Sequence, residues 1–75
     1  MYIVSVSTDA RTENIPEVQE VLTQYGKNIT TRLGIHNPDK ENTGVIIITY
    51  VSEDVEEFVE TLNSIHDVTA NFMEV

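Results

Sequence analysis

The sequence predicts an α+β sandwich in which a four-stranded antiparallel sheet carries two helices on one face. Segments with the two-residue period of strands alternate with segments of helical period, in the order strand, helix, strand, strand, helix, strand. A chain of 75 residues holds one such core and has no room for a second. We therefore expect residues 1–75 to form a single domain, small enough for self-association to help stabilise it.

Hydrophobic periodicity predicts the first strand and the first helix. Residues 1–8 alternate in polarity as a half-buried strand does. From Asn14, an expected N-cap, to Gly26, an expected C′ residue, apolar residues recur at helical spacing. Pro16 lies in the first turn, where its missing N–H costs nothing. We therefore expect a helix over residues 14–26.

The second half of the chain is expected to repeat this pattern after a hairpin. Residues 28–35 are predicted as a strand, and a turn-rich stretch separates them from residues 45–51, which are apolar on both faces as in a central strand. Ser52 is the expected N-cap of an amphipathic helix over residues 53–65. Residues 68–75 supply the last strand.

Two right-handed crossovers joined by a hairpin make a ferredoxin-like βαββαβ fold, with the first and third strands central and the others at the edges. Both helices cover one face, so the other face of the sheet stays open. The third strand must place one of two mostly apolar sets on it: Val45, Ile47, Thr49 and Val51, or Ile46, Ile48 and Tyr50. Because an exposed apolar sheet is normally a contact surface, we expect a dimer or tetramer packed through the open face.

The composition argues against several classes of function. The chain has 13 acidic and four basic residues, and its formal charge of −9 repels a nucleic-acid backbone. It has no cysteine, so disulfides, thiolate metal sites and thiol catalysis are absent. No apolar run is long enough to cross a membrane. We expect a cytoplasmic protein that binds neither nucleic acid nor a membrane.

Four stretches of the chain carry a resemblance to a known family. They are "QYGKNITTRLGI", "GVIIITYV", "SEDVEEFVETLNSI" and "DVTANF", and their most specific part is the Tyr25–Gly26 step followed by Arg32 and Gly34. Together they resemble small proteins named as regulators of iron-only hydrogenase systems. That family is similar in fold to the C-terminal domain of the nickel-responsive regulator and to ACT domains.

The resemblance covers nearly the whole chain. It implies an oligomeric regulatory module that binds a small ligand or a protein partner and has no DNA-binding segment of its own. The negative charge of the chain suits a basic partner.

Candidate site residues gather toward the end of the second predicted strand. Arg32 and Gly34 alternate there with apolar residues such as Leu33. If the apolar residues face the helices, Arg32 points to the open face, where a guanidinium can bind a carboxylate across a subunit contact. The alternative is an edge arginine that discourages strand pairing. With His36, these residues are expected to border the subunit contact or a ligand.

His36, Asp39 and Glu41 together form a candidate metal site, because imidazole and carboxylate groups suit first-row metals. Two histidines and no cysteine are too few for a site like that of the nickel-responsive regulator, so we expect no metal or cofactor.

Catalysis is not expected either, because no nucleophile lies beside a base. Tyr50 is the one aromatic hydroxyl that could line a pocket on the open face, although packing with the hydroxyl at the rim also explains it. Two alternatives to the regulatory module remain. One is an ACT-type domain that binds an amino acid near residues 7–18, where Asp9 matches loosely, and the other is a small dimeric oxygenase-type enzyme.

Overall fold

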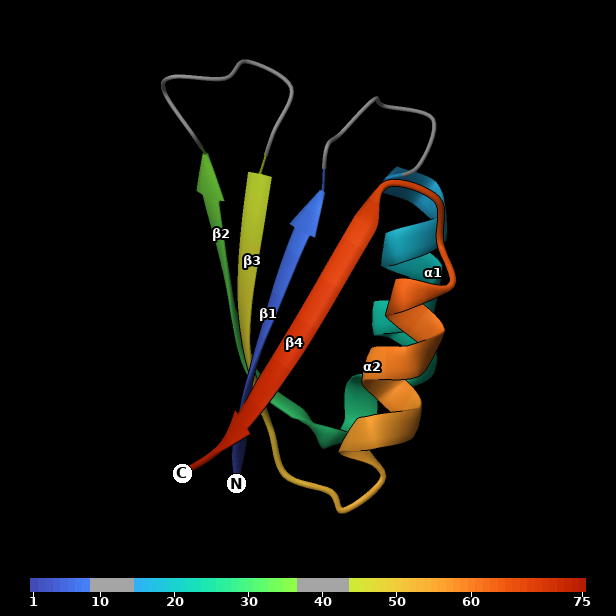
Figure 1. The fold of residues 1–75 in the computed structure, drawn as a ribbon. Coiled ribbons are helices and arrows are strands. Elements are labelled where there is room, and N and C mark those ends of the chain that lie inside the picture. The colour runs from blue at the N-terminus through green and yellow to red at the C-terminus, as the bar shows by residue number, and fades with distance from the viewer. Residues whose placement is uncertain (9–14, 37–43) are drawn as a thin grey trace.

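The computed structural model describes residues 1–8, 15–36 and 44–75. Its elements, in chain order, are β1 (Tyr2–Thr8), α1 (Ile15–Gln24), the 3-10 turn η2 (Gly26–Asn28), β2 (Ile29–His36), β3 (Gly44–Tyr50), α2 (Val55–Asn63) and β4 (Val68–Glu74). The strands form one antiparallel sheet in the order β2-β3-β1-β4 (Figure 1). The ferredoxin-like βαββαβ prediction is therefore confirmed, with β1 and β3 in the centre.

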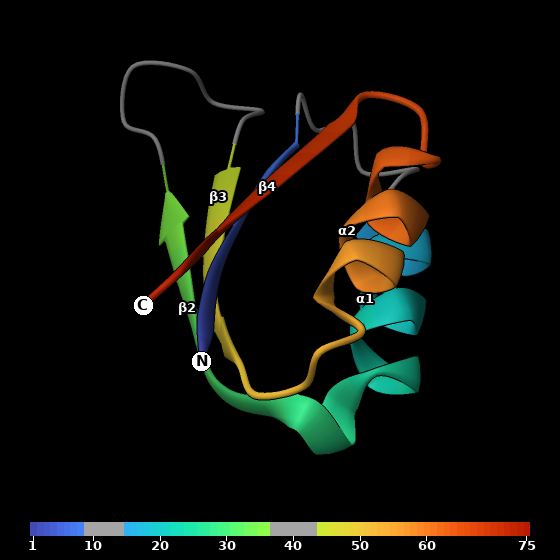
Figure 2. The ribbon, with the colours of Figure 1, turned by 60° about the horizontal axis from the view of Figure 1, so that its bottom comes forward.

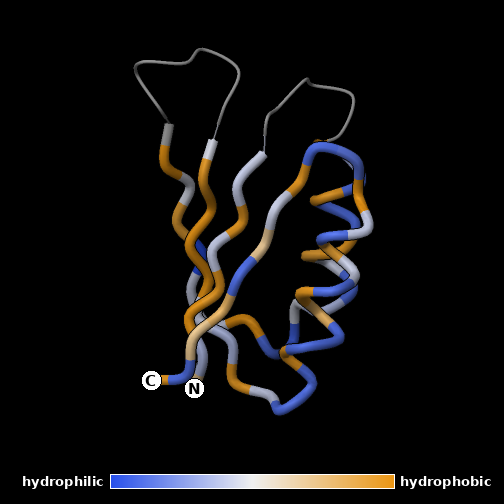
Figure 3. The backbone as a smooth tube through the Cα atoms, viewed as in Figure 1, coloured by the Kyte–Doolittle hydropathy of each residue, from blue (hydrophilic) through white to orange (hydrophobic). Residues whose placement is uncertain are grey.

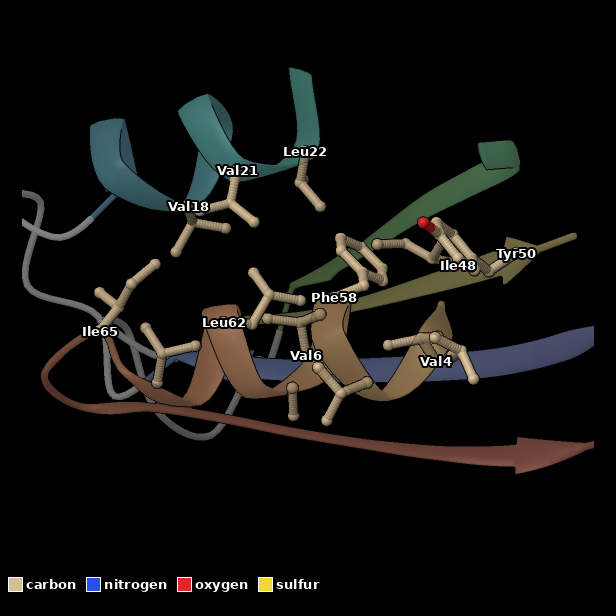
Figure 4. Packing of buried hydrophobic residues seen from close by; sticks show 14 residues of the cluster. Val4, Val6, Val18, Val21, Leu22, Ile48, Tyr50, Phe58, Leu62 and Ile65 are labelled. Atoms are coloured by element: carbon tan, nitrogen blue, oxygen red, sulfur yellow. The ribbon is translucent and has the colours of Figure 1, made fainter. Parts of the chain in front are cut away.

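Both helices lie on the same side of the sheet, so the described part of the chain has two layers (Figure 2). Between the layers, alternate residues of the central strands meet the apolar stripes of α1 and α2 (Figure 4). The ring of Tyr50 stacks on that of Phe58, with centroids 4.6 Å apart and planes inclined by 10°. Eight side chains are almost wholly buried: Val4, Val6, Val18, Leu22, Ile48, Tyr50, Phe58 and Leu62.

Helix α2 begins later than the sequence predicts. Its N-cap is Asp54 rather than Ser52, and the Asp54 side chain makes no capping hydrogen bond. The Tyr50 hydroxyl donates instead to Oδ1 of Asp54 at 2.8 Å. The carboxylate thus ties the start of α2 to the end of β3. Asn14, the expected N-cap of α1, lies outside the described residues.

A β-bulge interrupts β2 near its start and reverses the faces predicted for the rest of the strand. Ile29 pairs with Tyr50 and Thr31 pairs with Thr49, so Thr30 is an extra residue opposite a single step of β3. Its hydroxyl lies 2.6 Å from that of Thr49. Because strand side chains alternate, one inserted residue moves every later side chain to the other face.

The condition on which Arg32 is expected to reach the open face, that the apolar residues of this strand all face the helices, therefore does not hold. Ile29 packs against the core, whereas Leu33 and Ile35 lie on the open face, 57% and 46% exposed. Arg32 pairs with Ile48, which is buried beneath the helices, and so shares its face. The apolar residues of β2 are thus divided between the two faces of the sheet.

We expect Phe58→Ala to lower the free energy of unfolding by about 3–5 kcal/mol, because it removes a fully buried ring and leaves a cavity in the core. Urea unfolding at matched protein concentration measures the change. The exposed neighbour Glu56 supplies the control on the same helix, since Glu56→Ala should stay within about 0.5 kcal/mol. Similar midpoints for the two variants would contradict the central place of Phe58 in the core.

Candidate functional site

The open face of the sheet carries no charged side chain among the residues that the structure describes. The strand registers place twelve side chains on it: Ile3, Ser5, Ser7, Thr31, Leu33, Ile35, Val45, Ile47, Thr49, Thr69, Asn71 and Met73. Figure 3 shows the hydrophobic residues gathered along β2 and β3. Of the two sets predicted for β3, the one that contains Val45, Ile47 and Thr49 faces outward.

In the described part of the chain, the acidic residues lie instead on and around the helices. Glu17 and Glu20 are exposed on α1, and Glu56, Glu57 and Glu60 are exposed on α2. In a chain of net charge −9, this separation leaves one broad surface neutral and the opposite layer strongly negative. A neutral apolar surface of this kind is typical of a contact between macromolecules.

Arg32 lies on the helix-facing side of edge strand β2, not on the open face. Its Nη2 donates a hydrogen bond of 2.8 Å to Oε1 of Gln19 on α1. The bond spans the space between strand and helix. The expectation that Arg32 points to the open face fails because the bulge at Thr30 moves Arg32 and Gly34 together to the helix-facing side. The sequence pattern does not predict the hydrogen bond between Arg32 and Gln19, because this bond requires α1 to lie beside β2.

A pocket of about 240 Å³ opens between α1 and one end of the sheet, where β1 and β2 end and β3 begins. Helix α1 contributes Ile15, Val18 and Gln19 to its wall. The sheet contributes residues from three strands, including Thr8, Gly34, Gly44 and Ile46. Since Gln19 belongs to this wall, the guanidinium of Arg32 lies one hydrogen bond away from the pocket.

Two of the three glycines of the chain contribute to this pocket. A Cβ added to Gly34 would have no atom within 4 Å, and one added to Gly44 would make only ordinary contacts, at 3.7 Å from the Ile35 carbonyl oxygen and 4.0 Å from Thr8 Oγ1. Neither glycine has a positive φ. Packing and backbone conformation therefore do not require glycine at either position.

Tyr50 is fully buried under the helices, so of its two candidate roles its burial supports packing and not a pocket on the open face. Its register partners, Tyr2 on β1 and Ile29 on β2, also pack against the core, which fixes the side chain on that face. Burial, and then the hydrogen bond to Asp54, raise the pKa of the Tyr50 hydroxyl to about 12. Hydrogen bonds from Ser52 and Tyr50 lower the pKa of Asp54 below its usual 3.8. This pair links β3 to α2, and the buried Tyr50 side chain is not available to a substrate.

Of the candidate metal ligands, Asp39 and Glu41 lie outside the described residues, as does Asp9, and His36 is the last residue of β2. The described ranges contain no group of three or more histidine or acidic residues placed to hold a metal ion. The metal candidates therefore stay a prediction. Within the same ranges, no helix is both long and apolar enough to cross a membrane.

Comparison with known proteins finds relatives by structure only. No family model and no curated protein matches the sequence. The uncharacterized protein TM1266 from Thermotoga maritima superposes with a TM-score of 0.86 and 22% identity, over 96% of this chain and 91% of that one. A protein provisionally named an antibiotic biosynthesis monooxygenase, from Deinococcus radiodurans, gives 0.56 and 12%, over 100% and 92% of the two chains.

A formyltetrahydrofolate deformylase from Pseudomonas putida KT2440 contains a similar unit. It matches 99% of this chain but only 28% of its own length, with a TM-score of 0.61 and 8% identity. At these levels of identity the three structures share the fold with this chain. The similarity supports the ferredoxin-like architecture and leaves the function to be argued from the site.

We expect Tyr50→Phe to lower the free energy of unfolding by about 1.5–3 kcal/mol near neutral pH, the usual contribution of a hydrogen bond to a charged group. The folded-state pKa of Tyr50 is raised from 10.0 to about 12. The contribution of Tyr50 is therefore complete below pH 10 and is lost as pH rises toward 12. Chemical unfolding of both proteins across this range measures the difference.

Tyr25→Phe is the matched control, because the hydroxyl of Tyr25 makes longer contacts, at 3.3 Å to Thr61 and 3.4 Å to Glu57. Its removal should cost less than that of the Tyr50 hydroxyl. A stability difference between wild type and Tyr50→Phe that does not shrink above pH 10 would contradict the assigned pKa.

Proposed function

We propose that this domain is a self-associating regulatory module whose open sheet face packs against the same face of a second copy. The observation that carries the proposal is the absence of charge from that face in the described strands of a chain with net charge −9. Two such chains repel each other at long range. A neutral apolar face is the surface on which they can meet without placing like charges together.

The surface also has a suitable size and chemistry. A standard interface takes about 800 Å² from each partner, which is about one-sixth of the 4968 Å² accessible surface of this domain. Leu33, Ile35 and Met73 expose 57%, 46% and 61% of their surface there. Apolar groups at the centre of a contact are the usual source of its affinity. Two-fold symmetry would bury this face on both partners at once.

A basic protein partner fits this face less well than a second copy does. Such a partner would be attracted to acidic side chains, and those of the described residues lie on and around the helices. The acidic helix layer would stay exposed in the assembly that we propose. It remains the surface on which we would expect a basic partner to bind.

The regulatory part of the proposal rests on the resemblance to the regulators of iron-only hydrogenase systems, and a link to such a system belongs to it. The superposition with TM1266, itself uncharacterized, is compatible with this proposal. The oxygenase-type alternative draws on the similarity in fold to the Deinococcus radiodurans protein. We place it second, because the hydroxyl of Tyr50, its one candidate group, is buried and hydrogen-bonded to Asp54.

We expect Ile47→Glu to shift the protein from an oligomer to a monomer. Ile47 lies in the middle of the open face, between Ser5 and Leu33 on the neighbouring strands. A carboxylate there would be desolvated in the contact and would face its symmetry mate. We expect the apparent dissociation constant to rise by at least about 100-fold, which corresponds to a loss of about 2.7 kcal/mol of association free energy. Sedimentation equilibrium measures it.

Gln24→Glu, on the exposed end of α1, adds the same charge away from the open face and serves as the control. It should assemble like the wild type. A wild-type protein that sediments as a monomer at all concentrations, or an Ile47→Glu variant that assembles unchanged, would overturn the self-association proposal.

A further inference from the structure

The pocket between α1 and the strands has the character of a small ligand site. Its wall is largely apolar, with Ile15 and Val18 on the helix and Ile46 on the sheet. Gly34 and Gly44 leave room where side chains would otherwise project toward the helix. Glycine in a strand weakens it and often marks a close approach by a ligand or another backbone. Neither packing nor a positive φ requires glycine at these positions. We therefore interpret the free space as room for a bound ligand.

The charge beside the pocket indicates what kind of occupant. Among the described residues, Arg32 forms no ion pair; its recorded partner is the neutral amide of Gln19. An arginine has five N–H donors, and Nη2 uses one of them here. The remaining donors, and the amide N–H₂ of Gln19, are suited to bind the two oxygens of a carboxylate. In a chain of net charge −9, a guanidinium without an acidic partner among the described residues is free to attract an anion.

A second hollow makes the guanidinium accessible from the other side. It measures about 420 Å³, and Arg32 contributes to its wall together with residues from α1, η2 and β2. The Arg32–Gln19 hydrogen bond joins this hollow to the apolar pocket, because Arg32 lines the hollow and Gln19 lines the pocket. Arg32 itself does not line the apolar pocket, so a ligand there would meet the guanidinium at the Gln19 side of the wall.

The part of the pocket wall that the structure describes offers no partner for an ammonium group. None of its described lining residues is acidic. An amino acid would leave its ammonium unpaired there, at a cost that a simple carboxylic acid avoids. The volume of about 240 Å³ lies below the range usual for drug-sized ligands, which limits the apolar body to a few carbon atoms.

We propose that the pocket between α1 and the strands binds a small branched-chain monocarboxylate, with its apolar body over Gly34 and Gly44 and its carboxylate on Arg32 and Gln19. This inference specifies the ligand of the proposed regulatory module and rests on that function. It is tested separately from assembly through the open face, because the pocket opens between the sheet and α1, although Ile35 and Val45 of the open face also contribute to its wall.

The probe is 3-methylbutanoate, titrated into ¹⁵N-labelled protein at pH 7 and followed by the amide signals of Gly34, Gly44 and Gln19. We expect saturable shifts that are centred on these residues. Three further compounds separate the contributions: 3-methylbutanamide removes the charge, acetate removes the apolar body and leucine adds an ammonium. Each should bind at least about tenfold more weakly, since each loses about 1.4 kcal/mol or more.

Two variants test the site itself. Arg32→Gln should weaken binding at least about tenfold. Lys27→Gln, on η2, removes the same charge, but Lys27 lines neither the pocket nor the hollow beside Arg32, so this variant should bind as the wild type does. Gly34→Val should abolish binding by filling the space, because a Cβ there meets no other atom and valine favours strands. Circular dichroism confirms that each variant is folded.

The outcomes are distinct. No saturable shift at Gly34 and Gly44, or unchanged binding by either Arg32→Gln or Gly34→Val, overturns the site. Equal binding of leucine overturns the monocarboxylate assignment, and equal binding of the amide overturns the role of Arg32. Sedimentation of the same samples reports assembly separately. An oligomer that does not bind 3-methylbutanoate overturns this inference alone, and a monomer that binds it overturns the self-association proposal alone.

Discussion

The β-bulge at Thr30 decides how edge strand β2 divides its side chains between the two faces of the sheet. Ile29 precedes the extra residue and packs against the core, while Leu33 and Ile35 follow it and lie on the open face. Arg32 takes the opposite parity and meets α1 through Gln19. The short contact between the hydroxyls of Thr30 and Thr49, at 2.6 Å, holds the bulge against β3. Both candidate surfaces therefore depend on one inserted residue.

The distribution of charge follows from the same two-layer arrangement. The helices cover one face of the sheet and carry acidic side chains toward solvent, whereas the described residues of the open face carry none. The hydrophobic effect favours covering an apolar face, and like-charge repulsion disfavours contact through the acidic layer. Together these two effects favour the open face as the surface for the self-association that we propose. A small domain gains most from such a contact, because its own core is limited.

The two proposed sites are on opposite sides of β2 and share its backbone. Leu33 and Ile35 would contact a second copy, and Gly34 between them contributes to the pocket under α1. A ligand that fixes the position of Arg32 would also restrain the strand on which the contact is built. Such a shared strand is a physical basis for coupling between binding and assembly, because both would favour the same arrangement of β2. The anchored end of β3, where Tyr50 meets Asp54, lies apart from this coupling.

The sequence by itself determined the order of elements, the ferredoxin-like fold and the central place of β1 and β3, because periodicity of two and of 3.6 residues reports which element each segment forms. It also identified Arg32 and Gly34 as unusual positions. Only the tertiary structure decided which way they point. A bulge leaves no mark in the alternation of residues, since Thr30 reads like any other strand residue and its effect depends on the pairing with β3. The contact with Gln19, and the burial of Tyr50 beneath α2, likewise depend on how elements distant in sequence pack together.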